Sequence, residues 1–191
     1  MRRTCQALAA LTLAMGGIVA ASPARAGTES ACPVPAEADV QRSAKNRVDR
    51  PPRGAKAVRG LRVGRIPEGF SWGRVNVYKH DGLGEYGYVW SDDRDDTDRA
   101  HRLLWVRVAC WPEAARPAQL SGVPFVEGTF SDDMRQIRIG GRTVLTKEGD
   151  GALGHGRYAG WVERKGVVIT VMASEPLVAE LAGIIKGITL R

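Results

Sequence analysis

Hydrophobic and polar residues alternate along most of the chain beyond residue 60, which is the pattern of β-strands with one buried face. We expect strands at residues 61–66, 72–79, 86–90, 103–111, 134–139, 142–147, 158–164 and 167–173, with a weaker edge strand near residues 125–126. Turns at Gly140-Gly141 and Lys165-Gly166 each indicate a hairpin. The strand at 103–111 is apolar on both faces, which predicts a central strand covered on both sides.

The hydrophobic period changes near the end of the chain. Leu177, Leu181, Ile184 and Ile188 are spaced as one stripe of a helix, so we expect a helix over residues 176–188, with Ser174 as its N-cap. Strands followed by one amphipathic helix are typical of an α+β fold. The predicted architecture is a mainly antiparallel sheet of about six to eight strands with the C-terminal helix packed on one face.

The first residues have the pattern of a secretory signal peptide. A basic start is followed by an apolar run at residues 7–21 and by Ala24-Arg25-Ala26, so we expect cleavage after Ala26. No transmembrane anchor is expected after its removal, and the protein is predicted to be secreted or associated with the cell envelope. The chain then divides into a signal peptide (1–26), a disordered basic linker (27–59) and a single α+β domain (60–191).

The linker prediction rests on composition. Residues 27–59 contain four prolines and no aromatic residue, and such a segment buries too little apolar surface to offset its ordering entropy. Residues 41–65 carry nine basic side chains against Asp49 alone. Because export argues against nucleic acid, the partner expected for residues 41–65 is an envelope protein or an anionic surface polymer, and the alternative is a solvated linker.

Two cysteines remain once Cys5 leaves with the signal peptide. Cys32 and Cys110 form an even pair in a chain expected in an oxidising compartment, which favours a disulfide between them. Two free thiols are the alternative.

Two short motifs suggest ligands, and neither has the surroundings that its ligand needs. Residues 149–154 read GDGALG, the glycine spacing of a dinucleotide site, but the residues after them favour a strand instead of the required helix. The acidic run at 91–98 lacks the glycine and glutamate of an EF-hand loop. We therefore expect no cofactor and no metal.

Histidines and tryptophans supply the remaining candidates. His80, His101 or His155 together with Ser91 or Ser131 would support an extracytoplasmic hydrolase, although no nucleophile-elbow motif is present. Most tryptophans are expected to pack in the core, since their side chains bury a large area. A subset is a candidate ligand face between sheet and helix: Trp72, Trp90, Trp105 and Trp161.

The chain from about residue 66 to residue 188 resembles a known kind of domain. The resemblance is carried by Ile66-Pro67-Glu68-Gly69-Phe70 at its start, and by residues 139–145, 161–171 and 175–184. These segments are similar to the small α+β domain of exported bacterial proteins of unknown function, and distantly to the C-terminal domain of periplasmic regulators of anti-sigma factors. The matching positions are turn glycines, core aliphatic residues and one tryptophan. The resemblance thus implies a non-enzymatic binding module of the envelope, which would hold a protein or an amphipathic ligand on its sheet–helix face.

Overall fold

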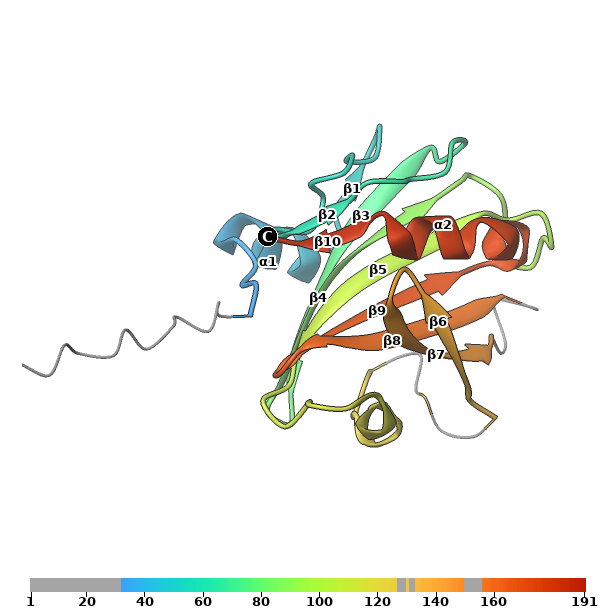
Figure 1. Ribbon diagram of the computed structural model, residues 1–191. Coiled ribbons are helices and arrows are strands. Elements are labelled where there is room, and N and C mark those ends of the chain that lie inside the picture. The colour runs from blue at the N-terminus through green and yellow to red at the C-terminus, as the bar shows by residue number, and fades with distance from the viewer. Residues whose placement is uncertain (1–31, 127–129, 131–132, 150–155) are drawn as a thin grey trace, which may run out of the picture. The chain divides into compact units, whose positions relative to one another are not determined.

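Eight strands form one antiparallel sheet in the order β1-β3-β4-β5-β9-β8-β7-β6 (Figure 1). The computed structural model describes residues 32–126, 130, 133–149 and 156–191. The strands of this sheet are β1 (Val48–Asp49), β3 (Trp72–His80), β4 (Leu83–Ser91), β5 (Leu103–Cys110), β6 (Arg135–Ile139), β7 (Arg142–Glu148), β8 (Arg157–Arg164) and β9 (Val167–Ala173). The predicted α+β class and its antiparallel sheet are confirmed.

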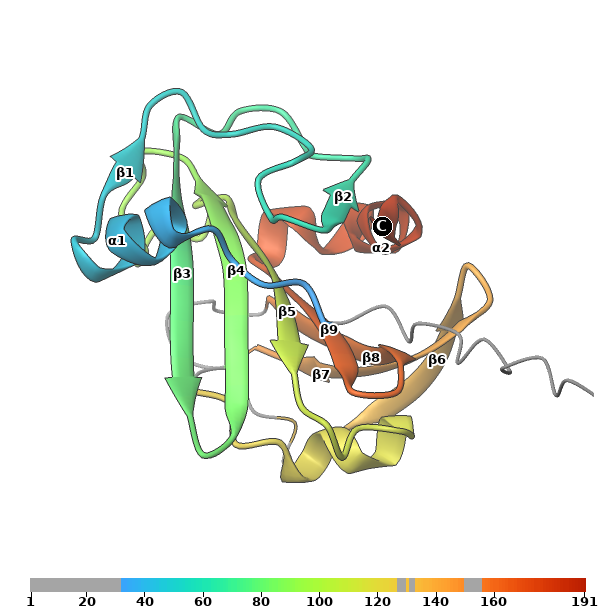
Figure 2. The same cartoon turned by 90° about the vertical axis from the view of Figure 1, so that its left-hand side faces the viewer.

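Segments of the chain cover both faces of the sheet (Figure 2), and a hydrophobic core lies beneath them on each face. β5 lies between β4 and β9, and its side chains alternate between the two faces. Leu104, Val106 and Val108 are buried on the first face, beneath the helix α2 (Leu181–Lys186) and the strand β2 (Leu61–Val63). Trp105 and Ala109 are buried on the second face, beneath residues 114–126, which include the short helix η1 (Pro117–Gly122), and beneath Phe130. The expectation of a central strand covered on both sides is confirmed.

The C-terminal helix is shorter than the apolar stripe predicts. The segment begins as the 3-10 helix η3 (Glu175–Glu180), continues as α2 and ends in β10 (Ile188–Leu190), which pairs with β2. The helix ends at Gly187, where it meets the residue that follows β2. The carbonyl of Gly187 accepts a hydrogen bond of 2.7 Å from the N–H of Gly64. Ser174 does not cap the helix, because its hydroxyl accepts the N–H of Leu103 instead.

The linker prediction for residues 27–59 requires a correction at residues 32–59. Residues 32–191 form one compact unit. The segment contains the helix α1 (Glu37–Ala44) and strand β1, and it places Ala57 and Val58 in the core of the first face. It also protects the outer edge of β3, where β1 pairs with residues 73–74 and the Ser43 hydroxyl accepts the N–H of Val77 at 2.9 Å.

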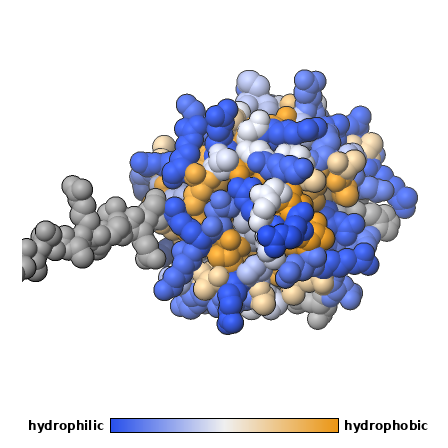
Figure 3. Space-filling view, viewed as in Figure 1, coloured by the Kyte–Doolittle hydropathy of each residue, from blue (hydrophilic) through white to orange (hydrophobic). Residues whose placement is uncertain are grey.

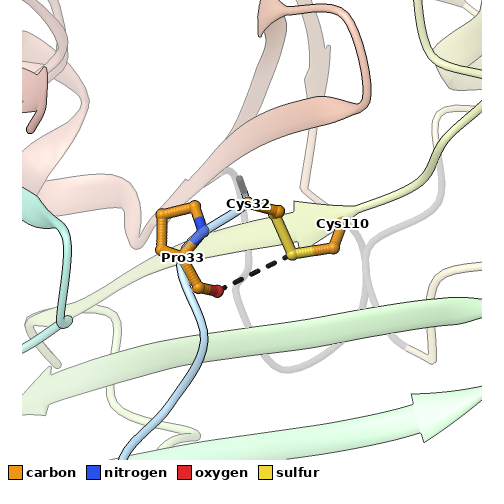
Figure 4. The surroundings of a disulfide bond; sticks show 3 residues. All are labelled: Cys32, Pro33 and Cys110. Carbon is orange, nitrogen blue, oxygen red and sulfur yellow. Dashed lines mark hydrogen bonds between the residues drawn. A yellow bond between two sulfur atoms is a disulfide. The ribbon is translucent and has the colours of Figure 1, made fainter. Parts of the chain in front are cut away.

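The predicted disulfide joins this segment to the sheet. Cys32 and Cys110 are bonded, with their Cα atoms 5.8 Å apart and their positions 78 apart in sequence (Figure 4). Cys110 is the last residue of β5, so the bond attaches the start of the described chain directly to the central strand.

Two expectations fall on residues that the structure does not describe. The signal peptide and its cleavage after Ala26 lie outside the described residues, as does most of the 149–154 motif. The strands on either side of that motif, β7 and β8, are antiparallel neighbours, whereas a dinucleotide site needs a parallel β-α-β unit. No helix among the described residues is long and apolar enough to span a membrane.

Candidate functional site

Three aromatic side chains on β4 hold the N-terminal segment by their polar tips. Tyr86, Tyr88 and Trp90 point to the first face because they alternate along one strand. The hydroxyl of Tyr86 donates to Asp39 and that of Tyr88 donates to Asp49, each at 2.8 Å. Burial raises the pKa of Tyr86 to about 12, so its hydroxyl keeps the proton that it donates. Trp90 donates its indole N–H to a main-chain carbonyl of the same segment at 2.7 Å.

Only part of the basic charge in residues 41–65 is neutralised. Arg53 forms ion pairs of 2.8 Å with both Asp39 and Asp49, and Arg42 also pairs with Asp49. These four side chains form a chain of alternating charge beside Tyr88. The charge pairing and the aromatic contacts together fix a segment that composition alone suggests is too polar to fold.

Five other basic side chains of this ordered segment remain exposed. We call them the basic face: Lys45, Arg47, Lys56, Arg59 and Arg62. No acidic side chain in the described part of the chain lies within ion-pair distance of them. Hydrophilic residues cover most of the surface on the α2 side of the molecule, and hydrophobic residues show only in small separate patches (Figure 3). The surface in this view is therefore mainly polar.

The four tryptophans of the predicted ligand face do not form one face, which corrects that prediction. Trp90 and Trp161 are each 1% exposed in the core of the first face, whereas Trp105 is buried in the core of the second. Trp72 is half-buried, and its indole donates to the carbonyl of Asp92. The space between the sheet and α2 is filled by packed side chains, so the tryptophans act there as core residues.

His101 makes the contact closest to a catalytic arrangement. Its Nε2 lies 2.8 Å from the Ser91 hydroxyl and 3.8 Å from Asp92. In a Ser-His-Asp triad the serine and the carboxylate contact opposite nitrogens of the ring, but here both approach the same nitrogen. Ser91 is also fully buried, which leaves its hydroxyl out of a substrate's reach. His155 and Ser131 lie outside the described residues.

A buried ion pair lies on the second face at the centre of the sheet. Arg107 of β5 and Glu85 of β4 are 1% and 2% exposed, and the Arg107 Nη1 donates to Glu85 at 2.6 Å. Arg107 also donates its Nε–H to Thr170 of β9 at 2.7 Å. Its guanidinium lies 4.7 Å from the ring centre of Trp105 and 4.3 Å from that of Phe125, in cation–π contact with both.

Glu85 is bonded on both of its oxygens. Besides Arg107, it contacts the His80 Nε2 at 2.9 Å and accepts the N–H of Val126 at 3.0 Å. Arg107 and Glu85 are not among the candidate residues predicted from the sequence. The available signal is a single arginine within an otherwise apolar central strand, because a charge buried at such a position needs a partner on a neighbouring strand.

The hydrogen bond with Glu85 makes the contribution of His80 to folding stability depend on pH. This bond, with a smaller contribution from Asp81, raises the pKa of His80 above its ordinary value of 6.5. A group whose pKa is raised on folding stabilises the protein most below its unfolded pKa, and this contribution is lost as pH rises through the folded value. The melting temperature should therefore fall between pH 6.5 and the raised pKa. A His80→Asn variant should show a smaller fall over the same interval, and an equal fall would contradict the assignment.

The acidic run at 91–98 forms a network with its own turn. Asp92 accepts from Arg94 and from the N–H of Arg102, and Asp98 accepts the N–H of Ala100 at 2.8 Å. Among the described residues, no group of three or more histidine, cysteine or acidic side chains is placed to hold a metal ion.

The chain matches no protein-family model, and no curated protein or solved structure is significantly similar to it.

Proposed function

We propose that this chain is a non-enzymatic binding module of the bacterial envelope that holds an anionic surface polymer on its basic face. The observation that carries the proposal is the exposure of five unpaired basic side chains on an ordered segment. Because the disulfide, Tyr86 and Tyr88 hold that segment in place, little conformational entropy is lost when a ligand binds. The disulfide also accords with an extracytoplasmic location, where such bonds persist.

Substitution tests the basic face better than deletion, because residues 57 and 58 belong to the core. The test variant combines Lys56→Gln, Arg59→Gln and Arg62→Gln. Each exposed cation near an anionic surface contributes about 1 kcal/mol at low salt, so the variant should lose about 3 kcal/mol of binding. Retention on immobilised heparin, a polyanion used in place of the polymer, measures the change as the salt concentration needed for elution.

A matched control removes the same charge elsewhere. Arg116, Arg135 and Arg138 are also exposed, and their triple glutamine variant should elute close to the unmodified protein. Equal losses in both variants would mean that only net charge matters and would count against the basic face.

The alternative function is an extracytoplasmic hydrolase, and the contact between Ser91 and His101 is its nearest candidate site, although Ser91 is fully buried. Turnover of an ester substrate that disappears in a Ser91→Ala variant would favour the hydrolase over the binding module.

A further inference from the structure

We propose that β6 is a docking edge to which an acidic, extended segment of another protein adds as a further strand. β6 is the last strand in the order of the sheet, and no described residue pairs with its outer side. On the opposite side of the sheet, β1 and Ser43 occupy the outer side of β3. The N-terminal segment thus covers one end of the sheet, whereas β6 offers the other end to a strand that binds through main-chain hydrogen bonds.

The register of the β6–β7 hairpin shows which main-chain groups of β6 point outward. A two-residue glycine turn joins the strands, so Ile139 and Arg142 make the first hydrogen-bonded pair. Hydrogen-bonded and non-hydrogen-bonded pairs alternate along antiparallel strands. Gln136 and Arg138 therefore point their N–H and C=O groups away from β7. In the described part of the chain these groups have no hydrogen-bond partner, so they are available to an incoming strand.

The side chains of β6 leave room for a neighbour. Arg135, Gln136, Ile137 and Arg138 are exposed, and only Ile139 is buried. Ile137 is 41% exposed, although it lies on the same face as Ile139, whose side chain belongs to the core of the first face. An apolar residue of an added strand, placed opposite Ile137, would cover this side chain.

The charge of β6 determines which strand fits. Arg135 and Arg138 form no ion pair with an acidic side chain among the described residues. Pairing of β6 with a second copy of itself would bring the two arginines of each copy together without a single acidic side chain. Opposite charges across a strand pair stabilise it and like charges destabilise it, so the occupant is an acidic segment of a different protein.

The two faces of β6 give the sequence pattern of this segment. Gln136 and Arg138 point to the second face, since Gln136 is in register with Leu145 of the second core, and Ile137 points to the first face. Residues opposite one another in an antiparallel pair share a face. The added strand should therefore alternate acidic residues, opposite Gln136 and Arg138, with apolar residues. In that register the acidic residues also direct their main-chain groups toward β6.

The test uses the peptide acetyl-(Val-Glu)3-amide and the ¹⁵N-labelled full chain. We expect the main-chain N–H signals of Gln136 and Arg138 to shift saturably, with a Kd of about 1 mM or lower. Methylation of the glutamate main-chain nitrogens removes the donors that face β6 and should weaken binding by about tenfold or more. Methylation of the valine nitrogens, which face solvent, should have little effect. The peptide acetyl-(Val-Lys)3-amide should not bind.

Substitutions at two positions of β6 test the same contacts from the side of the protein. Gln136→Pro removes an outward N–H without removing a hydrogen bond to β7, and proline is tolerated at such edge positions. This variant should bind the glutamate peptide about tenfold more weakly, whereas the matched Gln136→Ala, which keeps the N–H, should bind it normally. Arg138→Glu should also weaken binding of the glutamate peptide and should permit binding of the lysine peptide.

Four results would overturn the proposal. Absence of any shift at Gln136 and Arg138 would mean that the edge takes no strand. Equal binding of the peptide methylated at its glutamates would exclude strand addition, and equal binding of the lysine peptide would remove the role of charge. Dimerisation of the free protein that Gln136→Pro abolishes would identify a second copy as the occupant. The proposal does not depend on the basic face, because Gln136→Pro leaves the residues of that face unchanged.

Discussion

Replacing Glu85 with glutamine is expected to lower the free energy of unfolding by about 3–5 kcal/mol. The substitution removes the Glu85 carboxylate from the Arg107 guanidinium, which stays charged in a position where it is 1% exposed. Removal of one partner from a buried ion pair is costly because the remaining charge has lost its solvation and gained nothing in exchange. Urea unfolding followed by tryptophan fluorescence measures the loss.

Two control variants separate the loss of the buried ion pair from a nonspecific loss of stability. The ion pair between Arg50 and Asp93 is exposed on both sides, so Arg50→Gln should cost less than about 1 kcal/mol. The double variant Glu85→Leu with Arg107→Met removes both charges and should be more stable than Glu85→Gln alone. If Glu85→Gln cost no more than Arg50→Gln, the pair would contribute little to the stability of the sheet.

Loss of the disulfide is expected to have an effect of similar size. Because Cys32 and Cys110 are separated by 78 residues, the bond restricts a long loop of the unfolded chain, and its removal should cost about 4–5 kcal/mol. The double variant Cys32→Ser with Cys110→Ser avoids mixed disulfides. Its free energy of unfolding is compared with that of the oxidised protein.

The same variant tests how the N-terminal segment is held. The contacts of Tyr86 and Tyr88 do not depend on the disulfide, so the folded variant should keep its near-ultraviolet tyrosine signals while losing stability. A loss below about 1 kcal/mol would indicate that the unfolded chain gains little freedom when the bond is removed.

The strands were predictable because alternation is a local property. Leu104, Val106 and Val108 alternate with Leu103 and Trp105, and this pattern alone gives both the strand and its two buried faces. The stripe at Leu177, Leu181, Ile184 and Ile188 correctly identifies a buried apolar side, but it does not indicate where the helix ends. That end depends on β2, which approaches Gly187 from more than a hundred residues earlier in the chain.

The linker and the tryptophan face were predicted wrongly because the residues that contact these side chains are distant in the sequence. Residues 32–59 contain too few apolar side chains to predict a folded segment, yet polar contacts with Tyr86, Tyr88 and Trp90 hold it in place. A signal for this was available, because three alternating aromatic residues with polar tips need partners on their buried face. The tryptophans could not be assigned to one face because Trp90 and Trp105 lie on different strands, whose register is not visible in the sequence.

Ser43 and β1 cover the edge of β3. Proteolysis of this segment would therefore expose that edge. An open β-strand edge is a template on which further chains can add. A protease that trimmed the chain beyond Val48 would remove the residues that now occupy that edge and leave the main-chain groups of β3 free. The N-terminal segment thus also keeps the edge of β3 from pairing with strands of other chains.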